Sequence, residues 1–192
     1  MSVLIVGLIV FLGVHSVRIV AEPWRSAQIA RRGLNAWKGL YSLVSLAGFV
    51  LIVWGYGLAR AQPQLLWLPP RWAPHLSSLL MLFAFVLLVA AYVPRNGIKR
   101  AVKHPMLLGV MLWAIAHLLA NGTLADLLLF GSFLGWAVLD YLAARRRDHA
   151  AGDPPLPGGM AGTLIALVAG VAAWAVFAFW AHAWLFGVRP IG

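Results

Sequence analysis

Two histidines of this sequence stand inside stretches that are otherwise apolar. His15 and Arg18 lie within FLGVHSVRIV, residues 11–20, and His104 belongs to a Lys103-His104-Pro105 segment that opens another apolar run. Ionisable side chains are costly inside a membrane and usually face the interior of a helix bundle, so each is a candidate for function. Two neutral imidazoles at one depth on different helices meet the requirement for axial ligation of a haem iron.

The positions of the histidines along their helices decide which of them can share an iron atom. His15 lies about five residues before the end of its helix, roughly 7 Å deep, and His104 begins its own helix at a similar level. His117 is about 20 Å farther along the helix of His104 and roughly 220° around its axis, so those two cannot bind the same metal. The spacing therefore predicts His15 and His104 as the axial pair. The alternative at each position is a buried histidine bonded to a backbone carbonyl.

Cations close to this pair would complete such a site. Arg18, Lys38 and Lys103 are placed to receive the haem propionates near the membrane surface, where charge-assisted bonds from Lys and Arg to carboxylates are strong. The sequence contains no cysteine, which excludes thiolate ligands and cysteine nucleophiles. It also has no Gly-rich nucleotide motif, nucleophile elbow or zinc-protease motif, so these enzyme classes have no support from sequence.

The composition indicates a membrane protein. Of the 192 residues, 62% are hydrophobic and only 10% are charged, and a soluble domain of this length could not bury so much apolar surface. The net charge of +10 does not indicate nucleic acid, because the Lys and Arg residues cluster between apolar runs. The first run lacks a small-residue cleavage site and is therefore read as a mature helix rather than a signal peptide.

The fold class follows from the lengths of the apolar runs. Segments that can cross a hydrocarbon core of ~30 Å predict an all-α, polytopic bundle of about six transmembrane helices. They are Val3–Val20, Gly39–Leu58, Pro74–Val93, Met106–Ala120, Leu124–Ala144 and Met160–Val188. Most Lys and Arg residues follow the first, third and fifth segments, and this predicts that both termini face away from the cytoplasm.

We expect one transmembrane domain over residues 1–192, with a core at 1–147, a linker at 148–159 and a last helix at 160–188. The linker sequence DHAAGDPPLPGG is typical of a flexible connection. Gly131 and Gly135 form a G-x-x-x-G spacing, which predicts close packing against another helix.

Three motifs resemble the NnrU family of bacterial integral membrane proteins: FLGVHSVR, WKGLYSLVSLAGF and the long segment KHPMLLGVMLWAIAHLLANGTLADLLLFGSFLGWAVLD. That family is linked to denitrification and is in turn similar to 15-cis-zeta-carotene isomerase, a membrane enzyme that depends on haem b. The resemblance implies haem b, with His15 and His104 as ligands and His117 in reserve. It also implies either nitric oxide or redox metabolism, or isomerisation of a hydrophobic polyene. A multi-pass protein of the bacterial inner membrane is the location that it implies.

Two other classes of function stay open. The segment KHPMLLGVMLW also resembles part of the isoprenylcysteine carboxyl methyltransferases, which implies binding of S-adenosylmethionine, although Lys103 stands where that family usually has Arg. The second alternative is a non-catalytic assembly factor for a respiratory or denitrification complex. The G-x-x-x-G face and the outer loop would then be its contact surfaces.

Overall fold

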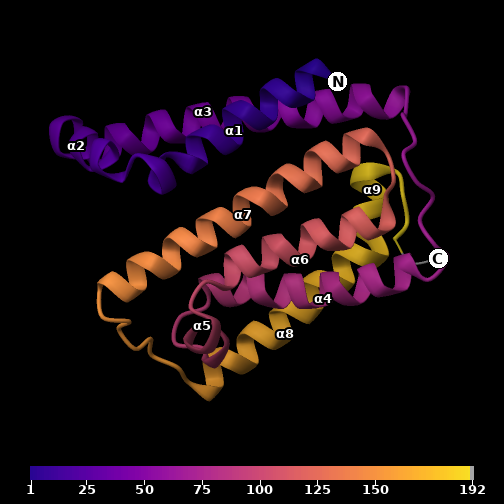
Figure 1. The fold of residues 1–192 in the computed structure, drawn as a ribbon. Helices are drawn as coiled ribbons and strands as arrows, with labels where there is room; N and C mark the ends of the chain where they lie inside the picture. The colour runs from indigo at the N-terminus through magenta and orange to yellow at the C-terminus, as the bar shows by residue number, and fades with distance from the viewer. Residues whose placement is uncertain (191–192) are drawn as a thin grey trace. The chain divides into compact units, whose positions relative to one another are not determined.

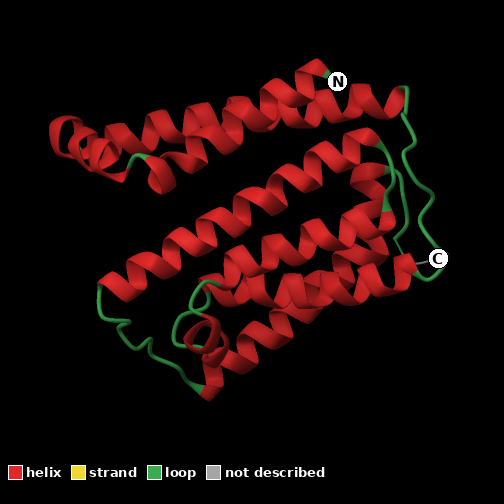
Figure 2. Cartoon of the chain, in the orientation of Figure 1, coloured by secondary structure: helices red, strands yellow, loops and turns green. Residues whose placement is uncertain are grey.

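The computed structural model describes residues 1–190, and over this range the chain is helical with no strand (Figure 2). The helices, labelled in Figure 1, are α1 (Ser2–Val20), α2 (Glu22–Arg32), α3 (Leu34–Ala61), α4 (Ala73–Tyr92), α5 (Gly97–Val102), α6 (Pro105–Ala120), α7 (Leu124–Ala150), α8 (Met160–Val176), a π-helical turn η1 (Phe177–Ala181) and α9 (His182–Phe186). The all-α prediction is confirmed.

Five of these helices are long and apolar enough to cross a membrane: α1, α3, α4, α7 and the continuous Met160–Phe186 segment. The shorter apolar α6 has 16 residues, which gives it a length of about 24 Å. All six predicted segments are therefore helical. The helix α7 continues to Ala150 instead of ending at Ala144, so residues 148–150 of the expected linker are helical. Arg145 pairs with Asp148 one turn later, which favours this extension.

The chain divides into two compact units. Unit 1 comprises residues 1–67 and 123–140, and unit 2 comprises residues 68–122 and 141–192, of which 191 and 192 are outside the described range. The orientation of the termini and the single-domain division stay predictions.

Unit 1 is built on the antiparallel pair of α1 and α3, which lie side by side in Figure 1. Their backbones meet at glycines. A Cβ atom at Gly55 would lie 2.3 Å from the backbone nitrogen of Leu4, and one at Gly48 would lie 2.7 Å from that of Phe11. Gly7 on α1 makes the matching approach to Ile52. Small residues allow this contact, because apolar side chains gain little from leaving lipid and packing must supply the attraction.

Unit 2 has α4 at its centre, with α6 and α8 packed against it (Figure 1). A Cβ atom at Gly170 of α8 would lie 2.6 Å from the Cα of Val86. Polar bonds accompany this packing: Ser77 Oγ donates to the carbonyl of Ala116 at 2.7 Å, and Trp174 Nε1 donates to that of Ser78 at 3.1 Å. Such bonds satisfy polar groups that lipid cannot.

A fully buried amide closes the turn between α4 and α5. Asn96 donates to the carbonyls of Ala90 and Val93 and accepts from the backbone N–H of Lys99 at 2.7 Å. One side chain thus satisfies free carbonyls of α4 and caps the first turn of α5. The following Gly97 N–H is bonded to Thr163 Oγ1 of α8 at 2.7 Å. This turn is therefore fixed to the start of the last long helix.

The glycine contact in unit 1 gives a stability prediction. Substitution Gly55→Ala places a methyl group on the backbone of Leu4 and should lower the free energy of unfolding by about 1–3 kcal/mol. Gly57→Ala on the same helix is the matched control, because a Cβ there meets no atom within 4 Å and alanine favours helix. An SDS titration in detergent micelles, followed by circular dichroism, measures both. Equal stability of the two variants would show that the close approach contributes nothing.

Candidate functional site

His15 lies in an aromatic cluster inside unit 1. Its ring stacks on Phe11 of the same helix, with centroids 4.2 Å apart, and it lies 5.2 Å from the ring of Tyr41 on α3. The ring of Trp136 on α7 meets it edge-on at 5.9 Å. Three helices therefore hold one imidazole among aromatic side chains, and this fixes the plane of the ring.

One hydrogen bond determines the tautomer of His15. The Nδ1 atom lies 2.6 Å from the carbonyl oxygen of Phe11, one turn earlier on α1. A carbonyl oxygen only accepts, so Nδ1 must carry the proton and the neutral ring keeps its lone pair on Nε2. Metal-binding histidines are commonly oriented by a bond of this kind from the second nitrogen. His15 thus offers a nitrogen ligand that is already oriented.

Three buried side-chain atoms of unit 1 have no hydrogen-bond partner within residues 1–190. They are Nε1 of Trp136, whose ring contacts His15, Oγ of Ser45 on α3, and Oε2 of Glu22 on α2. A buried donor without a partner costs free energy comparable to that of a lost hydrogen bond. The indole N–H beside His15 would gain an acceptor from a bound polar ligand, so the residues present fit a group that brings acceptor atoms.

The two predicted propionate anchors of unit 1 differ in their surroundings. The guanidinium of Arg18 lies 3.7 Å from the carboxylate of Glu22, and both side chains are more than a third exposed. Lys38 is exposed, and over the described range it makes no ion pair. Arg18 is therefore partly neutralised, whereas Lys38 keeps its full charge for an anionic partner.

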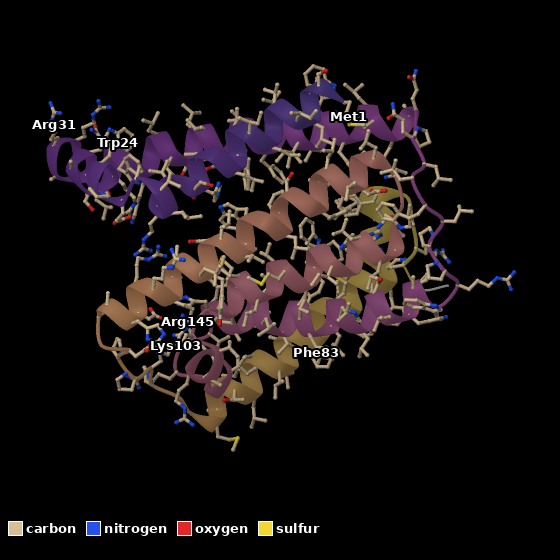
Figure 3. The ribbon with its side chains drawn as sticks, viewed as in Figure 1. Met1, Trp24, Arg31, Phe83, Lys103 and Arg145 are labelled. Atoms are coloured by element: carbon tan, nitrogen blue, oxygen red, sulfur yellow. The ribbon has the colours of Figure 1, made fainter. Side chains whose placement is uncertain are left out.

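His104 lies in unit 2, within a cluster of charges around the end of α7. Its Nε2 atom is 2.9 Å from Asp148, which also accepts from Arg145 at 3.1 Å. Lys103 pairs with Asp153, to which Arg145 and His149 are also bonded. Figure 3 labels Lys103 and Arg145 beside this cluster. The Lys103-His104-Pro105 segment is therefore held by two carboxylates.

The backbone at Lys103 is strained. Its φ angle is 60° and its ψ angle −50°, and the N–H of His104 donates to the carbonyl of Val102 at 2.7 Å. This is a γ-turn with positive φ, which residues with a side chain rarely adopt. Asp153, its ion-pair partner, also has a positive φ of 51°. The ion cluster stabilises a local conformation that the chain would otherwise avoid.

His117 near the end of α6 resembles His15 in its hydrogen bonding. Its Nδ1 atom donates to the carbonyl of Trp113, one turn earlier, at 2.8 Å. The neutral ring of His117 therefore carries its lone pair on Nε2, as His15 does, whereas His104 uses Nε2 to bond Asp148 and keeps a lone pair only on Nδ1. The neutral rings of His15 and His117 therefore carry the lone pair on Nε2, whereas that of His104 carries it on Nδ1.

A buried carboxylate at the start of α7 has a structural explanation. Asp126 accepts from Tyr56 Oη at 2.5 Å and from the backbone and side chain of Thr123 at 3.0 and 2.6 Å. Thr123 in turn receives the N–H of Asp126. This reciprocal pattern is a capping box, here reinforced from α3 by a tyrosine. Asp126 therefore caps α7 through Thr123 and is also bonded to α3 through Tyr56.

Sequence reasoning found His15 and His104 but missed their partners. Trp136 and Asp148 lie far along the chain from the histidines, so only their contacts reveal them. A local signal was available for Asp148, which follows Arg145 by one helical turn. Within residues 1–190 no group of three or more His, Asp or Glu side chains is arranged to hold a metal. Joint ligation of one haem by His15 and His104, which lie in different units, stays a prediction.

Comparison with known proteins identifies a family. The model of a family described as NnrU protein matches residues 3–190. No curated protein matches the chain, and no solved structure does.

The ion pair of Asp153, beyond the end of α7, gives a pH prediction. The ammonium of Lys103 holds the pKa of the Asp153 carboxyl below its usual value of about 3.9. A lowered pKa means that the pair stabilises the fold above pH ~4, and that this contribution is lost as the pH falls through the folded-state value.

The expected result is a melting temperature that stays higher in the natural protein than in Asp153→Asn at pH 6, with the difference shrinking below pH ~4. Lys103→Gln should return the pKa of Asp153 toward its ordinary value, so that the acid-dependent loss of stability becomes smaller. Arg71→Gln is the control, because it removes one cation from an exposed position. A difference between Asp153→Asn and the natural protein that is independent of pH would contradict the assignment.

Proposed function

Because this chain belongs to the NnrU family, we propose that it is a multi-pass membrane protein that binds haem b, with His15 as an axial ligand. The observation that carries the proposal is the buried Trp136 Nε1–H, which has no hydrogen-bond partner in the described residues and belongs to a ring that contacts His15. The bond from His15 Nδ1 to the carbonyl of Phe11 leaves the Nε2 lone pair available in the same aromatic setting. An isolated histidine in lipid would be costly, and ligation to iron would give the second nitrogen a partner.

The neighbours of His15 support a flat, partly polar ligand. Phe11, Tyr41 and Trp136 provide aromatic surface for a porphyrin, and the unsatisfied Trp136 Nε1–H can donate to an oxygen of the bound group. Lys38 is the better candidate for a propionate in this unit, because Arg18 already faces Glu22. When bound, the haem would supply iron that exchanges electrons or small ligands, while the chain holds it and excludes water.

The second axial ligand is predicted to be His104, with His117 in reserve. The depth of the two residues favours His104, which is predicted to lie at the level of His15. A porphyrin bound at Nδ1 is crowded by the backbone of its own histidine, and His104 offers only that nitrogen while Nε2 bonds Asp148. His117 donates to the carbonyl of Trp113 through Nδ1, as His15 does to that of Phe11. His104 becomes a ligand through Nε2 only if it leaves Asp148.

We place this haem in the bacterial inner membrane, in the nitric oxide and denitrification metabolism that the resemblance implies. Isomerisation of a polyene rests on the same resemblance, and both roles would use the same iron. Binding of S-adenosylmethionine has less support, because Lys103 and His104 are both engaged with carboxylates. A role in assembly of a respiratory complex would show itself as co-purification with a reductase or oxidase subunit.

The test is an absorption spectrum of the purified full chain, before and after reconstitution with haem b. The proposal expects a Soret band and the paired visible bands of bis-histidine ligation. His15→Ala should remove these bands, and only one of the two variants His104→Ala and His117→Ala should do the same. His182→Ala is the matched control, since its Nδ1 atom also bonds a backbone carbonyl, that of Val188, at 2.7 Å.

Folding is monitored for every variant by gel filtration and circular dichroism. Added imidazole should restore the spectrum of His15→Ala by occupying the vacant ligand position, which a merely misfolded variant would not allow. A protein that stays colourless with excess haem would contradict the proposal. An unchanged spectrum in His15→Ala would exclude this residue as the ligand. Nitric oxide added to the reduced protein then tests whether the iron has an exchangeable position.

A further inference from the structure

The amphipathic helix α2 carries a group of cations that the haem proposal does not use. α2 (Glu22–Arg32) joins α1 to α3 and packs against both, although at 11 residues it is too short to span a membrane. Trp24 and Arg31 project from it in Figure 3. Short amphipathic helices with aromatic and basic side chains typically lie flat in the membrane interface.

The charges on α2 are unbalanced. Glu22 is its single acidic residue, and Arg18 and Arg25 both pair with it, at 3.7 and 3.0 Å. Arg31 and Arg32 in the last turn are exposed. Within residues 1–190, neither side chain makes an ion pair or a hydrogen bond. Two consecutive arginines at the end of α2 therefore lack an anionic partner among residues 1–190.

An exposed aromatic side chain lies on the same side of α2 as one of these arginines. Trp24 is 54% exposed, and Arg31 follows it by two helical turns, which places both on one face. Trp24 packs edge-on against Trp37 of α3 at 5.8 Å, and the guanidinium of Arg25 lies 6.0 Å from the centre of the Trp37 ring. These contacts hold the indoles in place, so the exposed edge of Trp24 is a fixed surface.

We propose that α2 binds the headgroup of an anionic phospholipid of the phosphatidylglycerol class, with its phosphodiester held by Arg31 and Arg32 and its glycerol and upper acyl chains beside Trp24. Guanidinium groups bond phosphate oxygens in pairs, and tryptophan prefers the level of the headgroups. The predicted orientation places α2 on the cytoplasmic side, where basic segments attract anionic lipid. This inference uses none of the residues proposed to hold haem.

The test measures lipid binding to the full chain in detergent by native mass spectrometry, with phosphatidylglycerol and phosphatidylcholine as probes. The natural protein should prefer phosphatidylglycerol by about tenfold or more, since each arginine near the headgroup favours the anionic lipid. The double variant Arg31→Gln/Arg32→Gln should lower this preference to about twofold or less. Binding of phosphatidylcholine should be unchanged.

The matched control is Arg71→Gln/Arg189→Gln, which removes the same charge from two exposed arginines of unit 2. This control should keep the preference for phosphatidylglycerol. Trp24→Ala should weaken the binding of both lipids by a similar factor. An equal loss of the preference for phosphatidylglycerol in the control and in the α2 variant would overturn the proposal, because net charge would then explain the effect. The absence of any preference in the natural protein, or displacement of the lipid by millimolar inorganic phosphate, would overturn it as well.

Discussion

No water is available in the hydrocarbon layer, so each polar group there must find its partner inside the protein. The long helices of this chain meet that requirement mainly with backbone carbonyls as acceptors. His15, Ser16 and His117 each donate to the carbonyl one turn earlier, and Ser77 reaches across from α4 to α6. These bonds fix the rotamer of each side chain and, for the histidines, the tautomer. The candidate chemistry depends on this, because it determines which nitrogen could ligate iron.

Exceptions to this rule carry information about function. In the part of the chain that the structure describes, the buried side-chain atoms without a hydrogen-bond partner are Ser45 Oγ, Trp136 Nε1 and one oxygen of Glu22. Trp136 contacts His15, and Glu22 lies between Arg18 and Arg25. An unsatisfied donor next to an oriented imidazole is the arrangement that a bound polar group would complete. The carboxylates Asp126 and Asp148, by contrast, are fully used by a helix cap and an ion cluster.

The partner of a glycine or of a cation in this molecule cannot be read from the residue type alone. The helix pairs approach through glycine, as at Gly48 and Gly55 in unit 1 and at Gly170 in unit 2. The sequence spacing singled out Gly131 and Gly135, but a Cβ atom at Gly131 would meet only the Leu127 side chain at 3.8 Å, and one at Gly135 would meet nothing within 4 Å. Glycines seven residues apart on one helix face are harder to notice than a G-x-x-x-G motif, and only the partner helix reveals their role. Cations likewise look alike in sequence, yet Lys103 is neutralised by Asp153 whereas Arg31 is not.

The sequence by itself determined the helical class and the position of each apolar segment, because a membrane-crossing helix must be about 20 residues long and nearly free of charge. It also identified His15 and His104, since ionisable residues stand out in such segments. The short amphipathic helix α2 was missed because its polar composition gives no hydropathy signal. Only the tertiary structure decided what surrounds each histidine: an aromatic cluster from three helices for His15 and a carboxylate for His104. Those partners come from distant parts of the chain, and hydrogen-bond direction depends on folded geometry rather than on residue type.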